Sequence, residues 1–338
     1  MFERVLIIGH GNVGKRHLSL VRESLPEADI RVLRHSVEGV VPELANGCFY
    51  SLSDACDFLP QVSVVANPAP FHAEAALALL QVGSHVLLEK PLAHESESVK
   101  DLLSAEKKYQ RVLQIGYNLR FLASLRKFRE IIHSGAVGRV LSVRCEVGQY
   151  LPLWRPGSNY RNSVSAQKEL GGGVLLELSH EIDYLRWTFG DVAWVSAWLG
   201  MQSALDIDTE DVAHLTLGFA PDEAGHSLVA SVNLDFIRHD RTRFCTAIGE
   251  KGSIRWNGLS GDLEEWFAGG VEWSPSFKCD HHINNTYIDQ WECFLDCIKQ
   301  DRAPKITVAD GYAVLRIIDA ARKSDSSHYS RVDLEPYG

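Results

Sequence analysis

One stretch near the N-terminus decides the fold: Arg4-Val-Leu-Ile-Ile-Gly9-His-Gly11-Asn-Val-Gly14-Lys-Arg-His17. Its apolar start predicts a buried strand over 5–8, and the part after the glycines predicts a helix over 13–24. Gly9 would allow a tight turn, Gly11 would let the main chain approach a pyrophosphate, and Gly14 would let the helix pack on the strand. An ordinary strand–helix turn is the alternative, but glycines set between a strand and a helix favour a dinucleotide site. The turn residues expected to bind it are Gly9, His10, Gly11, Asn12, Val13 and Gly14.

The end of the next strand, predicted over 30–33, indicates which nucleotide the site prefers. An NAD site usually has a carboxylate here to accept a hydrogen bond from the ribose, whereas a 2′-phosphate attracts cations and donors. This chain has Arg34, His35 and Ser36 and no acid over 33–36. Arg34 could simply be a solvated strand end, but the pattern favours NADP over NAD.

Length and charge exclude several classes of protein. A chain of 338 residues suggests two domains, and a net charge of −10 without a basic stripe argues against nucleic acid as a partner. No apolar run approaches the ~18 residues of a membrane span. Because the chain enters a strand at once, we expect no signal peptide and a cytoplasmic location.

The seven cysteines are odd in number and scattered, which predicts reduced thiols rather than a disulfide framework. Cys279-Asp-His281-His282 with Cys293 and Cys297 suggests a metal site, but the spacing matches no zinc pattern. Apolar neighbours of Cys293 and Cys297 favour packed thiols. We therefore expect no metal.

Residues 1–120 read as an N-terminal Rossmann domain, because strands and helices alternate there. The fold class expected is α/β, with a doubly wound parallel sheet whose ligands bind beyond the carboxyl ends of the strands. Three predicted strand ends carry distinctive residues and should converge: Gly9, then Asn67-Pro68, then Glu89-Lys90-Pro91.

Residues 121–338 read as a C-terminal α+β domain for substrate binding and oligomerisation. Long alternating segments predict a large, open, mainly antiparallel sheet, and they lie over 140–150, 192–200, 212–219, 227–236, 243–249 and 253–256. A helix over 173–189 interrupts them, and the last helix could pack back on the N-terminal domain. A sheet face without helices suggests burial against a second subunit, as a homodimer or homotetramer.

Lys90 is the first residue with a chemical role to consider. A lysine at a strand end could reach the nicotinamide, and partial burial near a positively charged ring would lower its pKa and make it a usable proton carrier. The Lys90–Pro91 bond is a candidate cis peptide. A surface lysine is the plainer alternative.

The segment from Gly171 to Tyr184 is the second chemical group. In a continuous helix, Glu177, His180 and Tyr184 would share a face. His180 would move protons at neutral pH, with Glu177 or Asp183 orienting the ring. Between Lys90 and this segment lies a polar aromatic loop, residues 150–161, that suits a sugar, carboxylate or phosphate. The substrate residues expected are Tyr150, Trp154, Arg155, Tyr160 and Tyr184.

These motifs together resemble the glucose–fructose oxidoreductase / inositol dehydrogenase (Gfo/Idh/MocA) family over essentially the full length. The motifs that carry the resemblance are the glycine turn ending in His17, Asn67-Pro68 with His72, Glu89-Lys90-Pro91, Gly116-Tyr-Asn118-Leu-Arg120-Phe121, and the glycine triplet with its acid and histidine. The loop 150–156 is similar to a branch associated with bacterial surface-polysaccharide sugars. The resemblance implies that Lys90 and His180 are the catalytic pair and that Asn67, Pro68, His72, Glu89, Lys90, Pro91 and Asn118 lie at the cofactor.

Two departures from the family pattern concern the acid. Glu177 stands where an aspartate is usual, three residues before His180 rather than four, and Ser179 replaces a common glycine. The function expected is hydride transfer between nicotinamide and a hydroxyl or carbonyl carbon of a sugar, polyol or sugar derivative. Two alternatives stay open: a non-catalytic NAD(P)-binding regulator, and a redox-assisted epimerase or glycosidase that recycles its cofactor.

Overall fold

The computed structural model describes residues 2–35, 40–279 and 283–336. The chain divides into two compact units. The first comprises Met1–Tyr117 and Tyr287–Leu315, and the second comprises Asn118–Thr286 and Arg316–Gly338. Each unit is built on one sheet.

The first unit has a six-stranded sheet in the order β3-β2-β1-β4-β5-β6, and every pair in it is parallel. This confirms the predicted doubly wound parallel sheet. The order turns back between β1 and β4, which is where such sheets bind ligands. The strands are β1 (Arg4–Ile8), β2 (Asp29–Leu33), β3 (Gly47–Phe49), β4 (Val62–Val65), β5 (His85–Leu88) and β6 (Leu113–Ile115).

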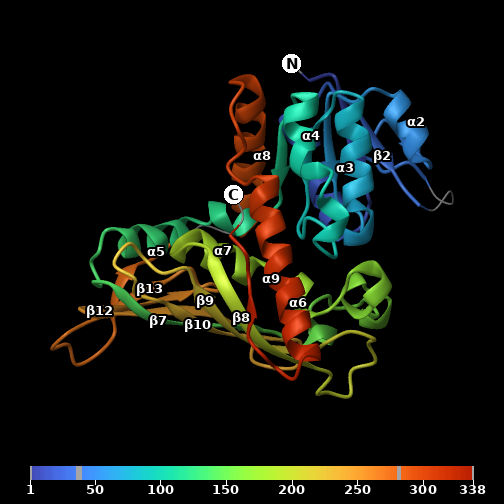
Figure 1. Cartoon of the computed structure of the whole chain (residues 1–338). Helices are drawn as coiled ribbons and strands as arrows, with labels where there is room; N and C mark the ends of the chain where they lie inside the picture. The colour runs from blue at the N-terminus through green and yellow to red at the C-terminus, as the bar shows by residue number, and fades with distance from the viewer. Residues whose placement is uncertain (1, 36–39, 280–282, 337–338) are drawn as a thin grey trace. The chain divides into compact units, whose positions relative to one another are not determined.

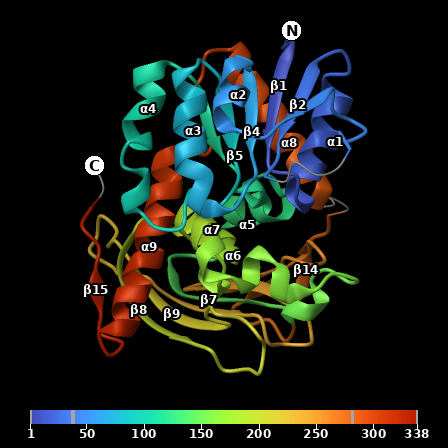
Figure 2. The same cartoon turned by 90° about the vertical axis from the view of Figure 1, so that its right-hand side faces the viewer.

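Helices lie on both faces of this sheet. On one face, Leu18 and Val21 of α1 and Trp291 and Phe294 of α8 share an apolar cluster with alternate strand residues such as Val5. In Figure 2, α3 stands in front of the strands and α8 behind them. The helices are α1 (Asn12–Ser24), α2 (Leu52–Asp57), α3 (His72–Gln81), α4 (Leu102–Tyr109) and α8 (Ile283–Lys299), whose first residues belong to the second unit. Because both faces are covered, the central strands are almost continuously apolar.

The second unit has a nine-stranded sheet in the order β14-β13-β12-β11-β7-β10-β9-β8-β15. Among the described strands of this sheet, only the β7–β10 pair is parallel, so the sheet is mixed but mainly antiparallel, as predicted. Its strands are β7 (Val140–Gly148), β8 (Val192–Gly200), β9 (Val212–Phe219), β10 (Val229–Asp235), β11 (Thr242–Gly249), β12 (Gly252–Asn257), β13 (Leu263–Phe267), β14 (Ser274–Phe277) and β15 (Val332–Asp333).

Helices α5 (Ala123–His133) and α7 (His180–Phe189) lie on one side of this sheet (Figure 1). The Tyr184 ring of α7 meets the Trp256 ring of β12 edge-on at 5.3 Å, which joins helix and sheet in one core. Along β7 the burial alternates, with Cys145 inward and Arg144 and Glu146 exposed. Period-two burial of this kind leaves the opposite face of the sheet open.

The predicted helix over 173–189 is wrong in one respect. The structure has two helices, α6 (Val174–Glu177) and α7, separated at Leu178 and Ser179. Leu178 leaves the helical region at φ −100°, ψ 22°. Glu177 therefore ends one helix and His180 begins the next, so Glu177 does not share a continuous helical face with His180 and Tyr184 as expected. The remaining long helix, α9 (Val308–Ser326), begins in the first unit and ends in the second.

Candidate functional site

The glycine turn between β1 and α1 has the shape that a pyrophosphate requires. Gly9 has φ +91°, and a Cβ there would lie 2.6 Å from the carbonyl oxygen of Ala66. A Cβ on Gly14 would collide with the Gly9 carbonyl, whereas a Cβ on Gly11 would meet nothing within 4 Å. Gly9 and Gly14 are thus needed for packing, and Gly11 leaves the main chain open to a ligand.

The start of α1 is suited to an anion. Gly11 is the N-cap, no side chain caps the helix, and Asn12 and Val13 open a first turn that has no acid. Burial lowers the pKa of His10 most, and the charges of Lys15 and Arg34 lower it further. A cationic surrounding and unsatisfied N–H groups together fit the diphosphate of a dinucleotide.

Arg34 stands directly after β2, where the adenosine ribose of a dinucleotide is bound in this type of sheet. Its guanidinium donates to the carbonyl oxygen of Val40 at 3.1 Å, and His35 beside it is exposed. Ser36, the third residue predicted here, lies outside the described residues.

The turns after β4 and β5 converge, as their strand ends predicted. His72 places Nε2 2.7 Å from the carbonyl oxygen of Asn67 and Nδ1 2.8 Å from that of Pro91. Pro68 precedes the short 3-10 helix Ala69–Phe71 that leads into α3. The Lys90–Pro91 peptide is cis, which confirms that prediction.

His72 itself needs a correction. Its ring is 1% exposed, and both nitrogens face backbone carbonyls. Burial is the largest influence and lowers the pKa of His72, although the contacts with the two carbonyl oxygens oppose this shift. The ring is enclosed between the two turns and does not present its nitrogens to a cofactor.

Glu89 is also turned into the protein. One carboxylate oxygen lies 2.6 Å from Nε2 of His17, which is fully buried on α1, and the other accepts the amide of Lys90 at 3.2 Å. A Cβ on Gly116 would lie 3.0 Å from the same carboxylate. Both carboxylate oxygens of Glu89 thus contact neighbouring residues. Lys90, the next residue, is half-buried.

In the second unit, His180 is the first residue of α7 and is half-buried. Asp183, one turn later, is fully buried, and its two oxygens accept from Arg120 at 2.6 and 2.9 Å. A bidentate guanidinium pair of this kind is strong and geometrically specific. The assignment of Glu177 or Asp183 as the acid that orients the His180 ring stays a prediction.

Tyr184 also needs a correction. Its ring is fully buried, and its hydroxyl lies 3.0 Å from Sγ of Cys145. Burial raises the pKa of Tyr184 well above its usual value. Tyr184 is a core residue under the sheet and does not face a substrate.

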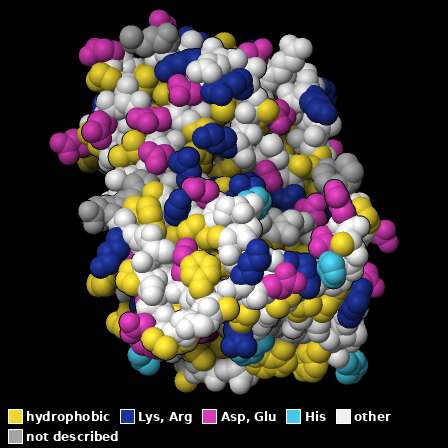
Figure 3. Space-filling view, turned by 90° about the vertical axis from the view of Figure 1, so that its left-hand side faces the viewer, with side chains coloured by type: hydrophobic (Ala, Val, Ile, Leu, Met, Phe, Trp, Pro, Cys, Tyr) yellow, Lys and Arg dark blue, Asp and Glu magenta, His cyan; other side chains and the backbone are white. Residues whose placement is uncertain are grey.

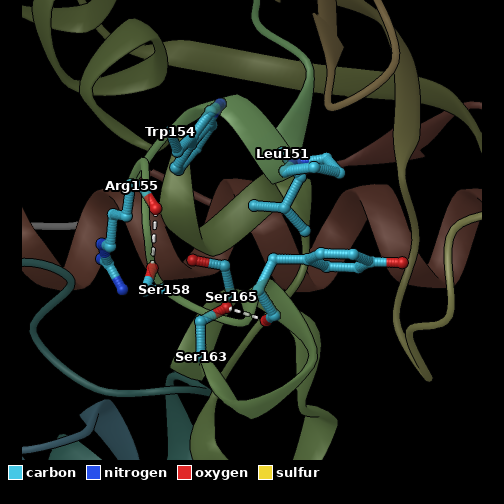
Figure 4. Close-up of a pocket in the computed structure, with 8 residues that line it drawn as sticks. Leu151, Trp154, Arg155, Ser158, Ser163 and Ser165 are labelled. Carbon is cyan, nitrogen blue, oxygen red and sulfur yellow. Dashed lines mark hydrogen bonds between the residues drawn. The ribbon is translucent and has the colours of Figure 1, made fainter.

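The polar aromatic loop forms a small pocket (Figure 4), lined by Leu151, Pro152, Trp154, Arg155, Ser158, Tyr160, Ser163 and Ser165. The structure therefore brings together three of the predicted substrate residues, Trp154, Arg155 and Tyr160. Tyr150 does not line this pocket; its ring contacts the His239 ring in a tilted arrangement, with centroids 4.3 Å apart. A free volume of about 10 Å³ accommodates one water molecule. A whole sugar would need additional walls.

Asn118 is 3% exposed, and its amide donates to Oγ1 of Thr286 at 2.7 Å. Its assignment to the cofactor stays a prediction.

Three buried or half-buried pairs could not be found by sequence reasoning: His17–Glu89, Arg120–Asp183 and Glu181–Arg243. In the last pair, Nε of Arg243 lies 2.8 Å from Oε1 of Glu181. Partners so far apart in sequence leave no local signal, although a histidine or acid inside an apolar pattern does require a partner.

The surface charges, the helices and the environment of the cysteines bear on the compositional analysis. On the face in Figure 3, basic and acidic side chains are interspersed. Among the described helices, none is long and apolar enough to cross a membrane.

Within the described ranges no three potential metal ligands gather; His281 and His282 lie outside those ranges. Cys297 is buried and Cys293 packs on the apolar cluster of the first unit, as packed thiols should.

Comparison with known proteins agrees with this geometry. Residues 3–117 match the model of the oxidoreductase family with an NAD-binding Rossmann fold, and residues 125–255 match the GFO/IDH/MocA C-terminal domain. Levoglucosan dehydrogenase of Pseudarthrobacter phenanthrenivorans is 34% identical over 74% of this chain and 72% of its own length. Inositol 2-dehydrogenase 3 of Saccharopolyspora erythraea is 24% identical over 95% of this chain and 92% of its own.

A solved structure of levoglucosan dehydrogenase in complex with NADH and levoglucosan has a TM-score of 0.83, with 25% identity over 98% of this chain and 99% of that one. The chain belongs to the Gfo/Idh/MocA family of NAD-binding oxidoreductases. It is an enzyme whose relatives are sugar and polyol dehydrogenases.

Proposed function

We propose that this oxidoreductase moves a hydride between nicotinamide C4 and a carbon that bears a hydroxyl or carbonyl group in a sugar or polyol. The observation that carries the proposal is Lys90: its backbone is fixed beyond β5, next to a turn that fits a dinucleotide. The names of the relatives supply the substrate class, cyclic compounds rich in hydroxyl groups. Bound nicotinamide would accept or return the hydride.

The remaining chemistry falls to side chains of this chain. In the direction of alcohol oxidation, His180 would accept the hydroxyl proton, and Glu177 would orient and stabilise the charged imidazole. The ammonium of Lys90 would stabilise the negative charge that grows on the substrate oxygen as the proton leaves. Trp154, Arg155 and Tyr160 would bind the outer hydroxyl groups, with Tyr150 at the edge of the same loop.

Replacement of Lys90 by methionine tests this role, because methionine keeps most of the side-chain volume and removes the charge. We expect turnover of levoglucosan or myo-inositol to fall about 100-fold or more, while the NADH dissociation constant stays within about threefold. Turnover is followed at 340 nm and binding by nicotinamide fluorescence. A variant that binds NADH poorly yet turns over normally once saturated would refute the catalytic role. Bound cofactor that shows no net absorbance change with any polyol would favour the recycling reaction.

We propose NADP as the preferred cofactor, with NAD as the alternative. Arg34 after β2, the absence of an acid over 33–35, and the cationic surrounding of His10 support a 2′-phosphate. Arg34→Ala should weaken NADPH binding about tenfold and leave NADH binding within about twofold. Arg31→Ala is the matched control, because Arg31 is on β2, three residues before Arg34, but pairs with Asp29. Equal losses for both nucleotides would contradict the preference.

We also propose a cytoplasmic homodimer or homotetramer that forms through the open face of the nine-stranded sheet. No disulfide joins the cysteines among the described residues, which supports a reducing compartment. The open face carries paired aromatic side chains, such as Trp198 against His214 with centroids 5.8 Å apart. Aromatic residues of this kind favour burial against a second copy.

A further inference from the structure

A short chain of contacts leads from helix α1 to the backbone of residue 90. It begins at Nε2 of His17, 2.6 Å from one oxygen of Glu89, and continues from the other oxygen to the amide of Lys90 at 3.2 Å. The side chain of His17 is fully buried and that of Glu89 is 9% exposed. All three residues belong to the first unit.

The His17 ring is held in place by its surroundings. The ring of Tyr287 meets it edge-on with centroids 5.7 Å apart, and the guanidinium of Arg16 covers the Tyr287 ring at 4.5 Å. Burial, followed by the charge of Glu89, raises the pKa of Tyr287 to about 12, so this hydroxyl stays neutral beside the carboxylate. The edge-on contact with Tyr287 therefore keeps Nε2 of His17 directed at Glu89.

The carboxylate of Glu89 has equally little freedom. A Cβ on Gly116 would lie 2.9 Å from the Cα of Glu89 and 3.1 Å from the amide nitrogen of Lys90, so the strand end after β6 already abuts this turn. A hydrogen bond to a charged group is stronger than a neutral one, and a buried carboxylate that loses its donor pays the full cost of desolvation. Without His17 the carboxylate would turn toward water and release the Lys90 amide.

We propose that His17 is a positioning residue for Lys90 and acts through Glu89. His17 fixes the carboxylate, the carboxylate fixes the amide of residue 90, and the amide fixes the direction in which the lysine side chain leaves the main chain. The inference deepens the proposed function, because it matters for catalysis only if Lys90 is catalytic.

Three variants separate positioning from stability. His17→Leu removes the donor, and His17→Gln keeps a donor near the position of Nε2. His85→Leu is the matched control: His85 lies at the other end of β5 and accepts the amide of Val112 on Nδ1 at 3.0 Å, without touching residue 90. Thermal unfolding shows how much each substitution destabilises the fold.

The first readout needs neither substrate nor cofactor. Acetic anhydride acetylates exposed amines, and mass spectrometry gives the rate at Lys90 relative to Lys107 on α4. We expect His17→Leu to change this ratio about threefold or more, because the amine moves into a different environment. His17→Gln and His85→Leu should keep the wild-type ratio. With substrate, kcat of His17→Leu should fall about tenfold or more, since small displacements of a catalytic group are costly, with KM nearly constant.

Glu89→Gln tests the positioning role if His17→Leu does not fold. It matches the shape of Glu89 but removes the charge that strengthens both hydrogen bonds, so we expect a smaller change in the Lys90 ratio. A folded His17→Leu or Glu89→Gln with wild-type acetylation of Lys90 and wild-type kcat would overturn the proposal. If Lys90→Met keeps its turnover, the proposed function fails, while the acetylation ratio still reports whether His17 positions the lysine.

Discussion

At the scale of single residues, some acids and histidines of this chain are bound in the interior, and others, to which the proposed function assigns the chemistry, are half-buried. His72, Asp183 and Tyr184 are buried and bound to backbone or side-chain partners of their own unit. His180 and Glu177 are half-buried at adjoining helix ends. The residue type alone does not reveal this division, because a buried polar group and a catalytic one both require polar partners.

The glycines of the first turn provide a prediction at this scale. Gly11→Ala should fold with a loss of about 1 kcal/mol or less, because its Cβ would meet nothing within 4 Å and its φ of −73° suits any residue. The same Cβ would occupy the approach of the diphosphate, so NADH binding should weaken about tenfold or more.

Gly14→Ala is the matched comparison, because its Cβ would collide with the Gly9 carbonyl. We expect it to lower the free energy of unfolding by about 1–3 kcal/mol. Urea unfolding and NADH fluorescence measure the two effects. If Gly11→Ala bound NADH like the wild type, the turn would not be the diphosphate site.

At the scale of elements, long periodic segments were predictable and short ones were not. The strands 192–200 and 212–219 have the predicted bounds, because alternation over eight or nine residues is a strong signal. Strand β3 has three residues and β14 has four, too few for a period. The break between α6 and α7 is not predictable from Leu178 and Ser179, because neither residue type requires a helix to end.

The cysteine pair beneath the sheet provides a prediction at this scale. Cys145 of β7 and Cys245 of β11 are opposite each other in the register, and burial raises the pKa of both thiols. In the unfolded chain such thiols ionise near pH 8.5. Above that pH the unfolded state loses protons that the folded state keeps, so the free energy of unfolding should fall as pH rises.

We therefore expect the melting temperature to decline between about pH 8.5 and pH 10.5, and the decline to be shallower in Cys145→Ala/Cys245→Ala. Cys48→Ala, a half-buried thiol on β3, is the control and should keep the wild-type slope. Melting curves at several pH values give the answer. Identical slopes in wild type and double variant would show that these thiols ionise equally in both states.

At the scale of the whole molecule, the C-terminal part of the chain returns to the first unit. Gln114 of β6 donates to the carbonyl of Gln290 on α8 at 3.1 Å, and the amide of Ile115 donates to Ile306 at 3.0 Å. The first unit thus needs residues 287–315 to complete its core. Amphipathic patterning shows that a helix has a buried face, but not which sheet it covers, so this return could only be guessed from the sequence.

The open sheet face leads to the last prediction. Ser231, Arg144, Thr246 and Arg255 form a row across β10, β7, β11 and β12, beside a hollow of about 420 Å³ that these residues help to line. If two copies meet through this face, the native mass in solution should be two or four times 37.7 kDa. The double substitution Ser231→Lys/Thr246→Lys would make all four positions of this row cationic on both copies. Like charges that face each other in an interface weaken binding by several kcal/mol.

We expect the double variant to be a monomer by light scattering. Ser19→Lys, an exposed substitution on α1, is the control for stability. At high salt the double variant should have a melting temperature close to that of this control. Raising the salt concentration should restore part of the assembly, because screening weakens the repulsion. A monomeric wild type, or a folded double variant with the wild-type mass at low salt, would show that this face is not the subunit interface.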